Sequence, residues 1–339
     1  MAATATSDAV LISSRTPLRV SFFGGGTDYP DYFSRHPGAV VGMAIDRYVY
    51  VSALRLSDII DYKYKLTYSR LERVLDASEL EHPVVRALLQ HEGVDCPLDI
   101  SIQADLPASS GLGSSSAFTV GLVNLLTALK GKTLTRLDLS RKAIHVEQVL
   151  LQENVGVQDQ LHAAFGGMNR FDFIDDRTRI TPVQMTTECE DYLLSSLVLV
   201  YTGKTRFASQ VLNEQVRSTK ERKIDRELSH LLSLVSQSVG VLEGSDPEAM
   251  LRDFGAMMHD GWQTKRSLSS GISNPEIDAL YDAAISAGAF GGKLCGAGGG
   301  GFLLMVVSPE NRQKFNRALE GHNRIPVGMD RHGSVILKS

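Results

Sequence analysis

The sequence changes from strand-like to helix-like on either side of a short segment rich in serine and glycine. Alternating apolar residues run from Leu98 to Leu106, and a helical apolar pattern begins at Ala117. Between them lies Pro-Ala-Ser-Ser-Gly-Leu-Gly-Ser-Ser-Ser, residues 107–116. Glycine lets the backbone approach an anion closely, and serine hydroxyls and the free N–H groups of a following helix can donate to it. The arrangement predicts a phosphate-binding loop with the candidate contacts Ser109, Ser110, Gly111, Leu112, Gly113, Ser114, Ser115 and Ser116.

This segment is not a Walker A motif. The string Gly-x-x-x-x-Gly-Lys-Ser/Thr does not occur in the chain. Residues 202–205, Thr-Gly-Lys-Thr, share its ending, but Val198 stands where the first glycine belongs. Because serine- and glycine-rich loops are also common as plain linkers, other motifs have to decide between the two interpretations.

The composition is that of a globular protein with one large or two medium domains. The 339 residues are 43% hydrophobic, and the net charge of −4 is spread without a basic block, which argues against nucleic acid as a partner. No apolar run reaches the roughly 18 residues of a membrane span, and residues 1–8 lack the features of a signal peptide. We therefore expect no membrane association and a cytoplasmic location. Cys96, Cys189 and Cys295 are too scattered to indicate a disulfide framework or a zinc site.

The order of elements predicts an α+β protein. Strand-like runs cover residues 11–23, 40–45, 48–54 and 98–106, and helical spacing occurs at 84–92, 117–129 and 135–151. After a polar stretch near residues 179–190 come a strand at 193–201, helices at 206–242, 247–268 and 275–287, and a strand at 302–307. We expect an N-terminal domain of residues 1–185 and a C-terminal domain of residues 186–339.

Two further glycine-rich segments accompany the serine-rich one. The first reads Gly-Gly-Gly-Thr-Asp-Tyr, residues 24–29, at the end of a strand. Asp28 could accept two hydroxyl groups of a sugar there, or could cap the turn after a glycine hairpin. The other, residues 291–301, has seven glycines in eleven residues directly before an apolar strand. It suits close contact between the backbone and another loop or a ligand, with a flexible turn as the alternative.

In this order the three segments resemble the motifs of the GHMP kinases, the family of galactokinase, homoserine kinase, mevalonate kinase and phosphomevalonate kinase. Residues 16–29, 107–117 and 293–301 are similar to the first, second and third family motifs, so the likeness spans nearly the whole chain. It implies a two-domain fold, with a left-handed β-α-β unit in the N-terminal domain and a ferredoxin-like C-terminal domain. The resemblance also implies ATP and Mg²⁺ as cofactors, with ATP and the substrate bound between the domains.

The resemblance assigns roles to individual residues. Asp159 matches the family's proposed catalytic aspartate, and Arg19 matches the cation expected beside it. Glu147 matches the Mg²⁺ carboxylate, with Ser115 or, as a second choice, its neighbour Ser116 as the other protein ligand. Without the resemblance, Asp159 could be a helix N-cap and Glu147 a charge on a helix surface.

Within the family, residues 24–32 and 153–160 look most like those of bacterial D-glycero-D-manno-heptose 7-phosphate kinases, which phosphorylate the anomeric hydroxyl for surface polysaccharide synthesis. This implies a sugar phosphate as the partner. The substrate-binding candidates are Gly25, Gly26, Thr27, Asp28, Tyr29, Gly298 and Gly299. For the distal phosphate we expect Lys204 and Arg206, because arginine binds phosphate in a bidentate manner; a solvated basic turn is the alternative.

Two alternatives stay open. Another sugar 1-kinase, of the fucose or galactose type, fits the same motifs. Some galactokinase relatives bind ATP and sugar as sensors and catalyse little. The presence of Arg19, Asp159, Glu147 and the serine-rich segment together favours catalysis, and the sequence leaves the oligomeric state open.

Overall fold

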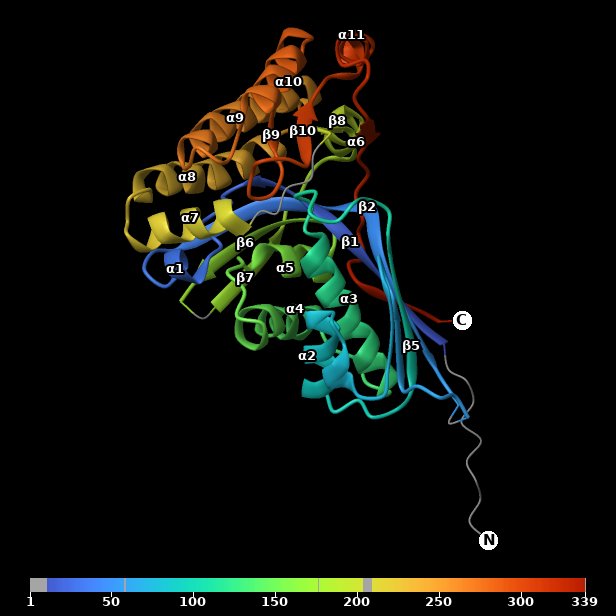
Figure 1. The fold of residues 1–339 in the computed structure, drawn as a ribbon. Helices are drawn as coiled ribbons and strands as arrows, with labels where there is room; N and C mark the ends of the chain where they lie inside the picture. Colours follow the sequence, from blue (N-terminus) through green and yellow to red (C-terminus); the bar gives the residue numbers. More distant parts are fainter. Residues whose placement is uncertain (1–10, 58, 176, 204–208, 339) are drawn as a thin grey trace.

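The computed structural model describes residues 11–57, 59–175, 177–203 and 209–338. Their strands form two sheets, and helices pack against each of them (Figure 1). The α+β class predicted from the element order is therefore confirmed. A search of the described helices finds none that is both long enough and apolar enough to cross a membrane.

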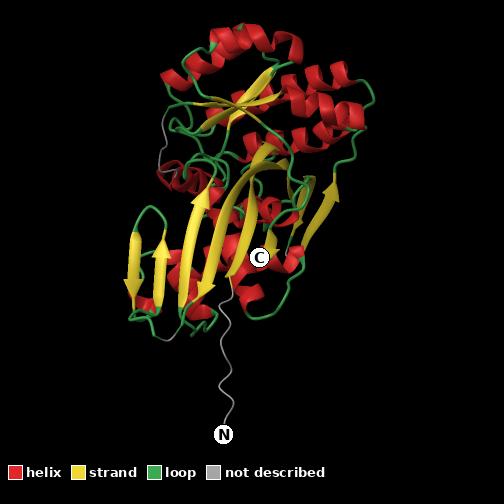
Figure 2. Cartoon of the chain, turned by 90° about the vertical axis from the view of Figure 1, so that its right-hand side faces the viewer, coloured by secondary structure: helices red, strands yellow, loops and turns green. Residues whose placement is uncertain are grey.

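The larger sheet is built around one long strand. β2 (Gly38–Arg55) pairs with β1 (Leu11–Phe23) along most of its length, with β6 (Met168–Ile174) in its first part and with β5 (Leu98–Ala104) in its second part. The other strands of this sheet are β3 (Tyr64–Thr67), β4 (Leu71–Val74), β7 (Arg177–Pro182) and β12 (Val335–Lys338). Figure 2 shows these strands side by side with helices behind them.

The helices behind this sheet pack around α3 (Ser114–Leu129). Apolar and small residues occupy almost every position of α3, so it can be buried on all sides between β1, β2 and its neighbouring helices. Those neighbours are α4 (Arg136–His145) and α5 (Gln158–Phe165), with the π-helical turn η2 (Val146–Leu150) between them. The remaining elements of this part are α1 (Pro30–Phe33), the 3₁₀ turn η1 (Ala77–Glu79) and α2 (Pro83–His91).

The smaller sheet has its strands in the spatial order β11-β8-β10-β9. The strands are β8 (Leu197–Tyr201), β9 (Gly291–Leu294), β10 (Phe302–Val306) and β11 (Arg324–Pro326). The intervening elements are α7 (Ser209–Lys220), α8 (Asp225–Leu242), α9 (Pro247–Ser267), α10 (Pro275–Ser286), the turn η3 (Pro309–Asn311) and α11 (Arg312–Ala318). Helices after β8 and between β10 and β11 give the β-α-β-β-α-β succession of a ferredoxin-like unit, as the resemblance implied.

Aromatic packing joins the two parts of the molecule close to the first glycine-rich segment. Phe254 on α9 packs edge-on against Phe22 and Phe23, the last two residues of β1. All three side chains are almost completely buried. Edge-to-face aromatic pairs add stability beyond their buried area, so these contacts help to hold the end of β1 against α9.

Three details differ from the sequence-based expectations. Residues 193–196 belong to helix α6 (Thr187–Ser196), because Thr186 caps that helix by accepting the N–H of Cys189. The helix expected over 206–242 is interrupted between α7 and α8, where Arg222 has a φ of +58°. The last strand, β12, lies in the segment expected to form the C-terminal domain, but it pairs with β1 of the larger sheet.

Candidate active site

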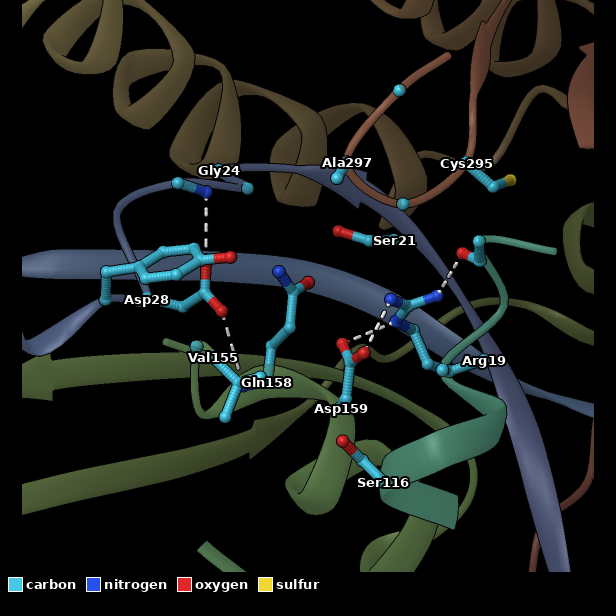
Figure 3. Close-up of a pocket in the computed structure, with 18 of the residues that line it drawn as sticks. Arg19, Ser21, Gly24, Asp28, Ser116, Val155, Gln158, Asp159, Cys295 and Ala297 are labelled. Carbon is cyan, nitrogen blue, oxygen red and sulfur yellow. Dashed lines mark hydrogen bonds and ion pairs between the residues drawn. The ribbon is translucent and has the colours of Figure 1, made fainter. Parts of the chain in front are cut away.

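A cavity between the two sheets is lined by parts of all three glycine-rich segments (Figure 3). We call residues 24–29 the first loop, residues 107–116 the serine loop and residues 295–301 the third loop. The end of β1, the turn η2, the start of α5 and helix α9 complete the walls. Segments from both ends of the chain therefore meet at one cavity.

The serine loop and the third loop pack backbone against backbone. A Cβ atom on Gly111 would lie 2.4 Å from the carbonyl oxygen of Cys295, and one on Gly301 would lie 2.3 Å from that of Ser110. Gly111 also has a φ of +82°. No side chain fits at these two positions, which explains why the two segments are rich in glycine.

The N-terminus of α3 opens onto the cavity. Its N-cap residue, Gly113, is in the left-handed conformation and supplies no side-chain cap, so the first N–H groups of α3 are free to bind an anion. Six of the predicted phosphate contacts line the cavity: Ser109, Gly111, Gly113, Ser114, Ser115 and Ser116. Ser110 and Leu112 do not; both are buried, and the carbonyl of Leu112 accepts the backbone N–H of Arg19 at 3.0 Å.

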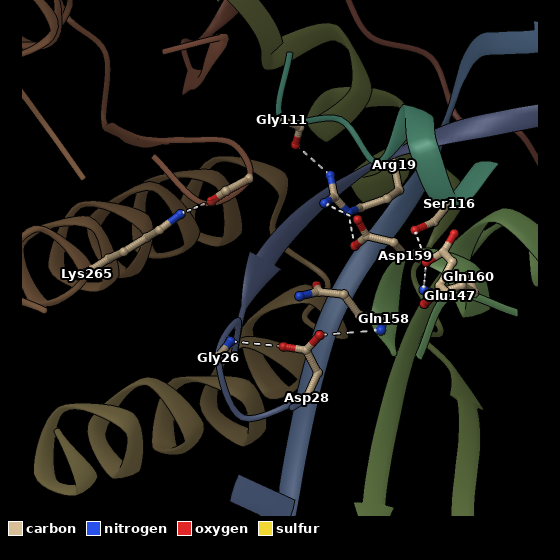
Figure 4. A network of polar contacts seen from close by, with 11 residues as sticks. Arg19, Gly26, Asp28, Gly111, Ser116, Glu147, Gln158, Asp159, Gln160 and Lys265 are labelled. Atoms are coloured by element: carbon tan, nitrogen blue, oxygen red, sulfur yellow. Dashed lines mark hydrogen bonds and ion pairs between the residues drawn. The ribbon is translucent and has the colours of Figure 1, made fainter. Parts of the chain in front are cut away.

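Arg19 and Asp159 form a bidentate ion pair in the cavity wall. Nε and Nη2 of Arg19 donate to the two carboxylate oxygens at 2.7 and 2.8 Å, and Nη1 donates to the carbonyl of Gly111 at 2.7 Å (Figure 4). Burial opposes the charge on Arg19, but Asp159, with smaller contributions from Cys295 and Asp28, outweighs this effect and raises the pKa of the guanidinium. Asp159 lies in the first turn of α5, where the helix dipole favours a negative charge. The pair expected from the sequence is thus assembled beside the serine loop.

Glu147 lies on the π-helical turn η2, an irregularity that is frequent at functional sites. One of its oxygens accepts hydrogen bonds from Ser116 at 2.9 Å and Gln160 at 2.5 Å, and the hydroxyl group of Thr119 also interacts with this carboxylate. Burial raises the pKa of Glu147 to about 7. Ser115 also lines the cavity, but Ser116 is the serine that contacts Glu147.

A buried carboxylate next to two serines fits a hard cation. Mg²⁺ takes oxygen ligands and is commonly held by one or two protein groups together with waters and substrate phosphates. The described residues contain no cluster of three or more His, Cys, Asp or Glu side chains that could hold a metal by themselves. The donor set at Glu147 is therefore compatible with Mg²⁺ only when the cation also binds the nucleotide.

The first loop is held mainly by its own polar groups. Asp28 accepts the N–H of Gly26 at 3.0 Å and that of Gln158 at 3.4 Å, and burial raises the pKa of its carboxyl group. Thr27 is buried and donates its hydroxyl hydrogen within the loop region, to Gly24 or Ala39. Of the predicted substrate contacts here, Gly25, Gly26, Asp28 and Tyr29 line the cavity and Thr27 does not.

The other predicted substrate contacts differ in whether they line the cavity. Gly298 lines the cavity, whereas the N–H of Gly299 donates to the carbonyl of Ile272 at 2.9 Å and anchors the third loop. Lys204 and Arg206, expected at the distal phosphate, lie outside the described residues.

Sequence reasoning missed several polar side chains that line this cavity, among them Gln158, Lys265 and Lys293. Gln158, one residue before Asp159, lies between Asp28 and Asp159, and its side-chain oxygen has no partner (Figure 3). Lys265 on α9 and Lys293 on β9 approach from the side of the smaller sheet. A lysine in a buried strand is unusual enough to have drawn attention to Lys293, but nothing local distinguishes Lys265 from a surface lysine of a helix.

Comparisons with known proteins agree with this geometry. Residues 76–167 match the model of the GHMP kinases N terminal domain, and residues 248–324 match that of the GHMP kinases C terminal region. The chain is 28% identical to a D-glycero-alpha-D-manno-heptose 7-phosphate kinase of Campylobacter jejuni over 91% of this chain and 93% of that protein. It is 27% identical to a galactokinase of Chloroflexus aggregans over 93% of this chain and 88% of that protein.

Solved structures show the same fold. A D-glycero-D-manno-heptose 1-phosphate kinase from Bacteroides thetaiotaomicron superposes with a TM-score of 0.72 at 24% identity, over 97% of this chain and 99% of that one. The two matched regions contribute much of the cavity: the first supplies the serine loop, Glu147 and Asp159, and the second supplies Lys265 and the third loop, while Arg19 and the first loop precede the first match. The chain therefore belongs to the GHMP kinases, and it is an ATP-dependent sugar kinase.

Proposed function

We propose that the protein phosphorylates the anomeric hydroxyl of D-glycero-D-manno-heptose 7-phosphate to give the 1,7-bisphosphate, for the synthesis of nucleotide-activated heptose and surface polysaccharide. The observation that carries the proposal is the Arg19–Asp159 pair, which lies between the open N-terminus of α3 and the first loop. The Campylobacter jejuni relative supports the choice of sugar through its name. Fucokinases and galactokinases are also among the relatives, so the choice has to be tested directly.

Different residues of the cavity have different roles in phosphoryl transfer. The N–H groups and serine hydroxyls at the start of α3 hold the ATP phosphates, and the first loop and Gln158 hold the sugar. Asp159 orients the anomeric hydroxyl and accepts its proton as the sugar oxygen bonds to the γ-phosphorus. The bond from the γ-phosphorus to the bridging oxygen breaks, and ADP leaves with the electron pair. Arg19 stabilises the charge that develops on the transferred group.

Glu147 and Ser116, with Ser115 beside them, would hold Mg²⁺ at the nucleotide. When bound, the cation supplies neutralisation of phosphate charge. Glu147 itself would then be ionised, because a cation opposes the effect of burial on its carboxyl group.

The substrate assignment is tested by measuring ADP release with ATP and Mg²⁺ on a panel of acceptors. The panel contains heptose 7-phosphate, heptose, mannose, fucose, galactose and mevalonate. We expect the highest kcat/KM on heptose 7-phosphate, with phosphorus NMR showing a new anomeric phosphate. A preference for an unphosphorylated sugar would keep the sugar-kinase assignment and reject this substrate.

Glu147 predicts a pH dependence that is independent of turnover. Because its pKa is raised in the folded protein, the folded state binds this proton more tightly than the unfolded state does. Its contribution to stability is therefore present below the unfolded pKa and is lost as the pH rises to about 7, by an amount on the order of 3 kcal/mol. In thermal unfolding without metal, we expect wild type to lose stability relative to Glu147→Gln as the pH rises.

Magnesium should reverse this loss. Added MgCl₂ together with ADP is expected to raise the melting temperature of wild type more than that of Glu147→Gln at alkaline pH. Glu320→Gln, on an exposed glutamate, serves as the matched control and should behave as wild type. If the melting temperatures of Glu147→Gln and wild type changed in parallel over this pH range, the assignment of Glu147 as a protonated carboxyl group that binds the metal would be rejected.

A further inference from the structure

Two lysines of the smaller-sheet part line the cavity opposite the catalytic pair. Lys265, near the end of α9, donates to the carbonyl oxygen of Leu294 at 3.2 Å and to that of Gly296. Lys293, on β9, is 8% exposed and donates to the carbonyl oxygen of Phe22 at 3.0 Å. In Figure 4, Lys265 extends from its helix toward the third loop, on the far side of the cavity from Ser116 and Glu147.

Neither ammonium group has a carboxylate partner among the residues the structure describes. An ammonium has three N–H donors, so one donor of Lys265 and two of Lys293 have no acceptor within the described chain. Desolvation, with nearby positive charges as a smaller cause, lowers the pKa of Lys265 to about 7 and that of Lys293 to about 8. Cations removed from water without a counter-ion are costly, so this part of the cavity favours a bound anion.

The position of Lys293 places this anion close to the first loop. The ATP phosphates belong at the open N-terminus of α3, beside Glu147. Lys293 instead reaches the end of β1, directly before the glycines of the first loop where the sugar is placed. Lys265 lines the same cavity from the third loop, where Gly296 packs against Gly111 of the serine loop. An anion bound by Lys293 would lie next to the first loop, where the sugar is placed.

We propose that Lys265 and Lys293 form the subsite for the phosphate that the sugar substrate carries away from its reacting hydroxyl. This assignment rests on the proposed function, and it places the distal phosphate in the described cavity, apart from Lys204 and Arg206. The two ammonium groups also fix loop carbonyls, so a purely structural role is the competing explanation. That role predicts equal losses on phosphorylated and unphosphorylated sugars, whereas a phosphate subsite predicts a selective loss.

The test compares kcat/KM for heptose 7-phosphate and heptose in wild type, Lys265→Met and Lys293→Met. Each substitution is expected to lower the preference for the phosphorylated sugar by about 10- to 100-fold, the effect of losing a hydrogen bond to a charged group. Sulfate, used as a probe of the empty subsite, should inhibit wild type competitively with heptose 7-phosphate and less strongly in both variants. Lys314→Met, on an exposed lysine of α11, is the matched control and should retain the wild-type preference.

The outcomes of these experiments distinguish a failure of the proposed phosphate subsite from a failure of the proposed function. Equal losses on both sugars, or sulfate inhibition competitive with ATP alone, would overturn the subsite. If either methionine variant failed to fold, sulfate competition in wild type and the other variant would decide. If wild type preferred an unphosphorylated sugar, the proposed function would fail; calorimetry of sulfate binding to wild type and Lys265→Met would then still support or overturn the anion site.

Discussion

Asparagine in place of Asp159 is expected to lower kcat by about 10²- to 10⁴-fold, because the amide cannot accept the proton of the sugar hydroxyl. The substitution should leave the fold intact, since the asparagine oxygen can still accept one N–H group of Arg19. Steady-state kinetics on the best acceptor of the panel measures the loss. Circular dichroism and calorimetric titration with ATP establish that the variant folds and binds nucleotide.

A second arginine–aspartate pair provides the control for this experiment. On β6, Nε and Nη2 of Arg170 both donate to one carboxylate oxygen of Asp172, outside the cavity. Asp172→Asn should therefore cost some stability but leave kcat close to that of wild type. If Asp159→Asn also kept the wild-type kcat, Asp159 would have no part in proton transfer, and positioning of the reactants would be the remaining source of catalysis.

Alanine in place of Gly111 is expected to abolish measurable nucleotide binding and to destabilise the protein by about 3 kcal/mol or more. Its Cβ would overlap the carbonyl oxygen of Cys295, and its φ of +82° is unfavourable for alanine. The serine loop and the third loop would have to separate. Because the carbonyl of Gly111 also accepts an N–H of Arg19, the catalytic pair would shift with the loop. Calorimetric ATP titration and thermal unfolding measure the two effects.

Substitution of Gly131 is a control that distinguishes the effect of backbone strain from the effect of the contact between the two loops. This glycine has a φ of +69°, but no atom lies within 4 Å of the position that a Cβ would take. Gly131→Ala should therefore cost only about 1 kcal/mol, the price of a left-handed alanine, and should bind ATP normally. Similar losses in the two variants would mean that conformational strain, and not the contact between the loops, explains the glycine at position 111.

Local sequence patterns determined much of this protein. A strand, a serine- and glycine-rich turn and an apolar helix have strong local signals, so the position of the serine loop at the N-terminus of α3 could be predicted. The resemblance of the motifs placed Arg19 next to Asp159, and the structure pairs them. It also pointed to Glu147, whose role as a metal ligand remains a prediction. These features depend on residues close together in the sequence or on motifs whose spacing is distinctive.

Other features depend on contacts between distant segments, which no local pattern encodes. Ser116 and not Ser115 meets Glu147, because the direction of a side chain from the first turn of α3 follows from how that helix packs against η2. Strand β12 joins β1 across more than three hundred residues of sequence. In the sequence, Lys265 cannot be distinguished from other helical lysines. Only the packing of α9 brings its ammonium group to the carbonyl groups of Leu294 and Gly296. The sequence alone determined which motifs the protein has, and tertiary packing decided which charges share the cavity, because burial and pairing arise only when the two sheets come together.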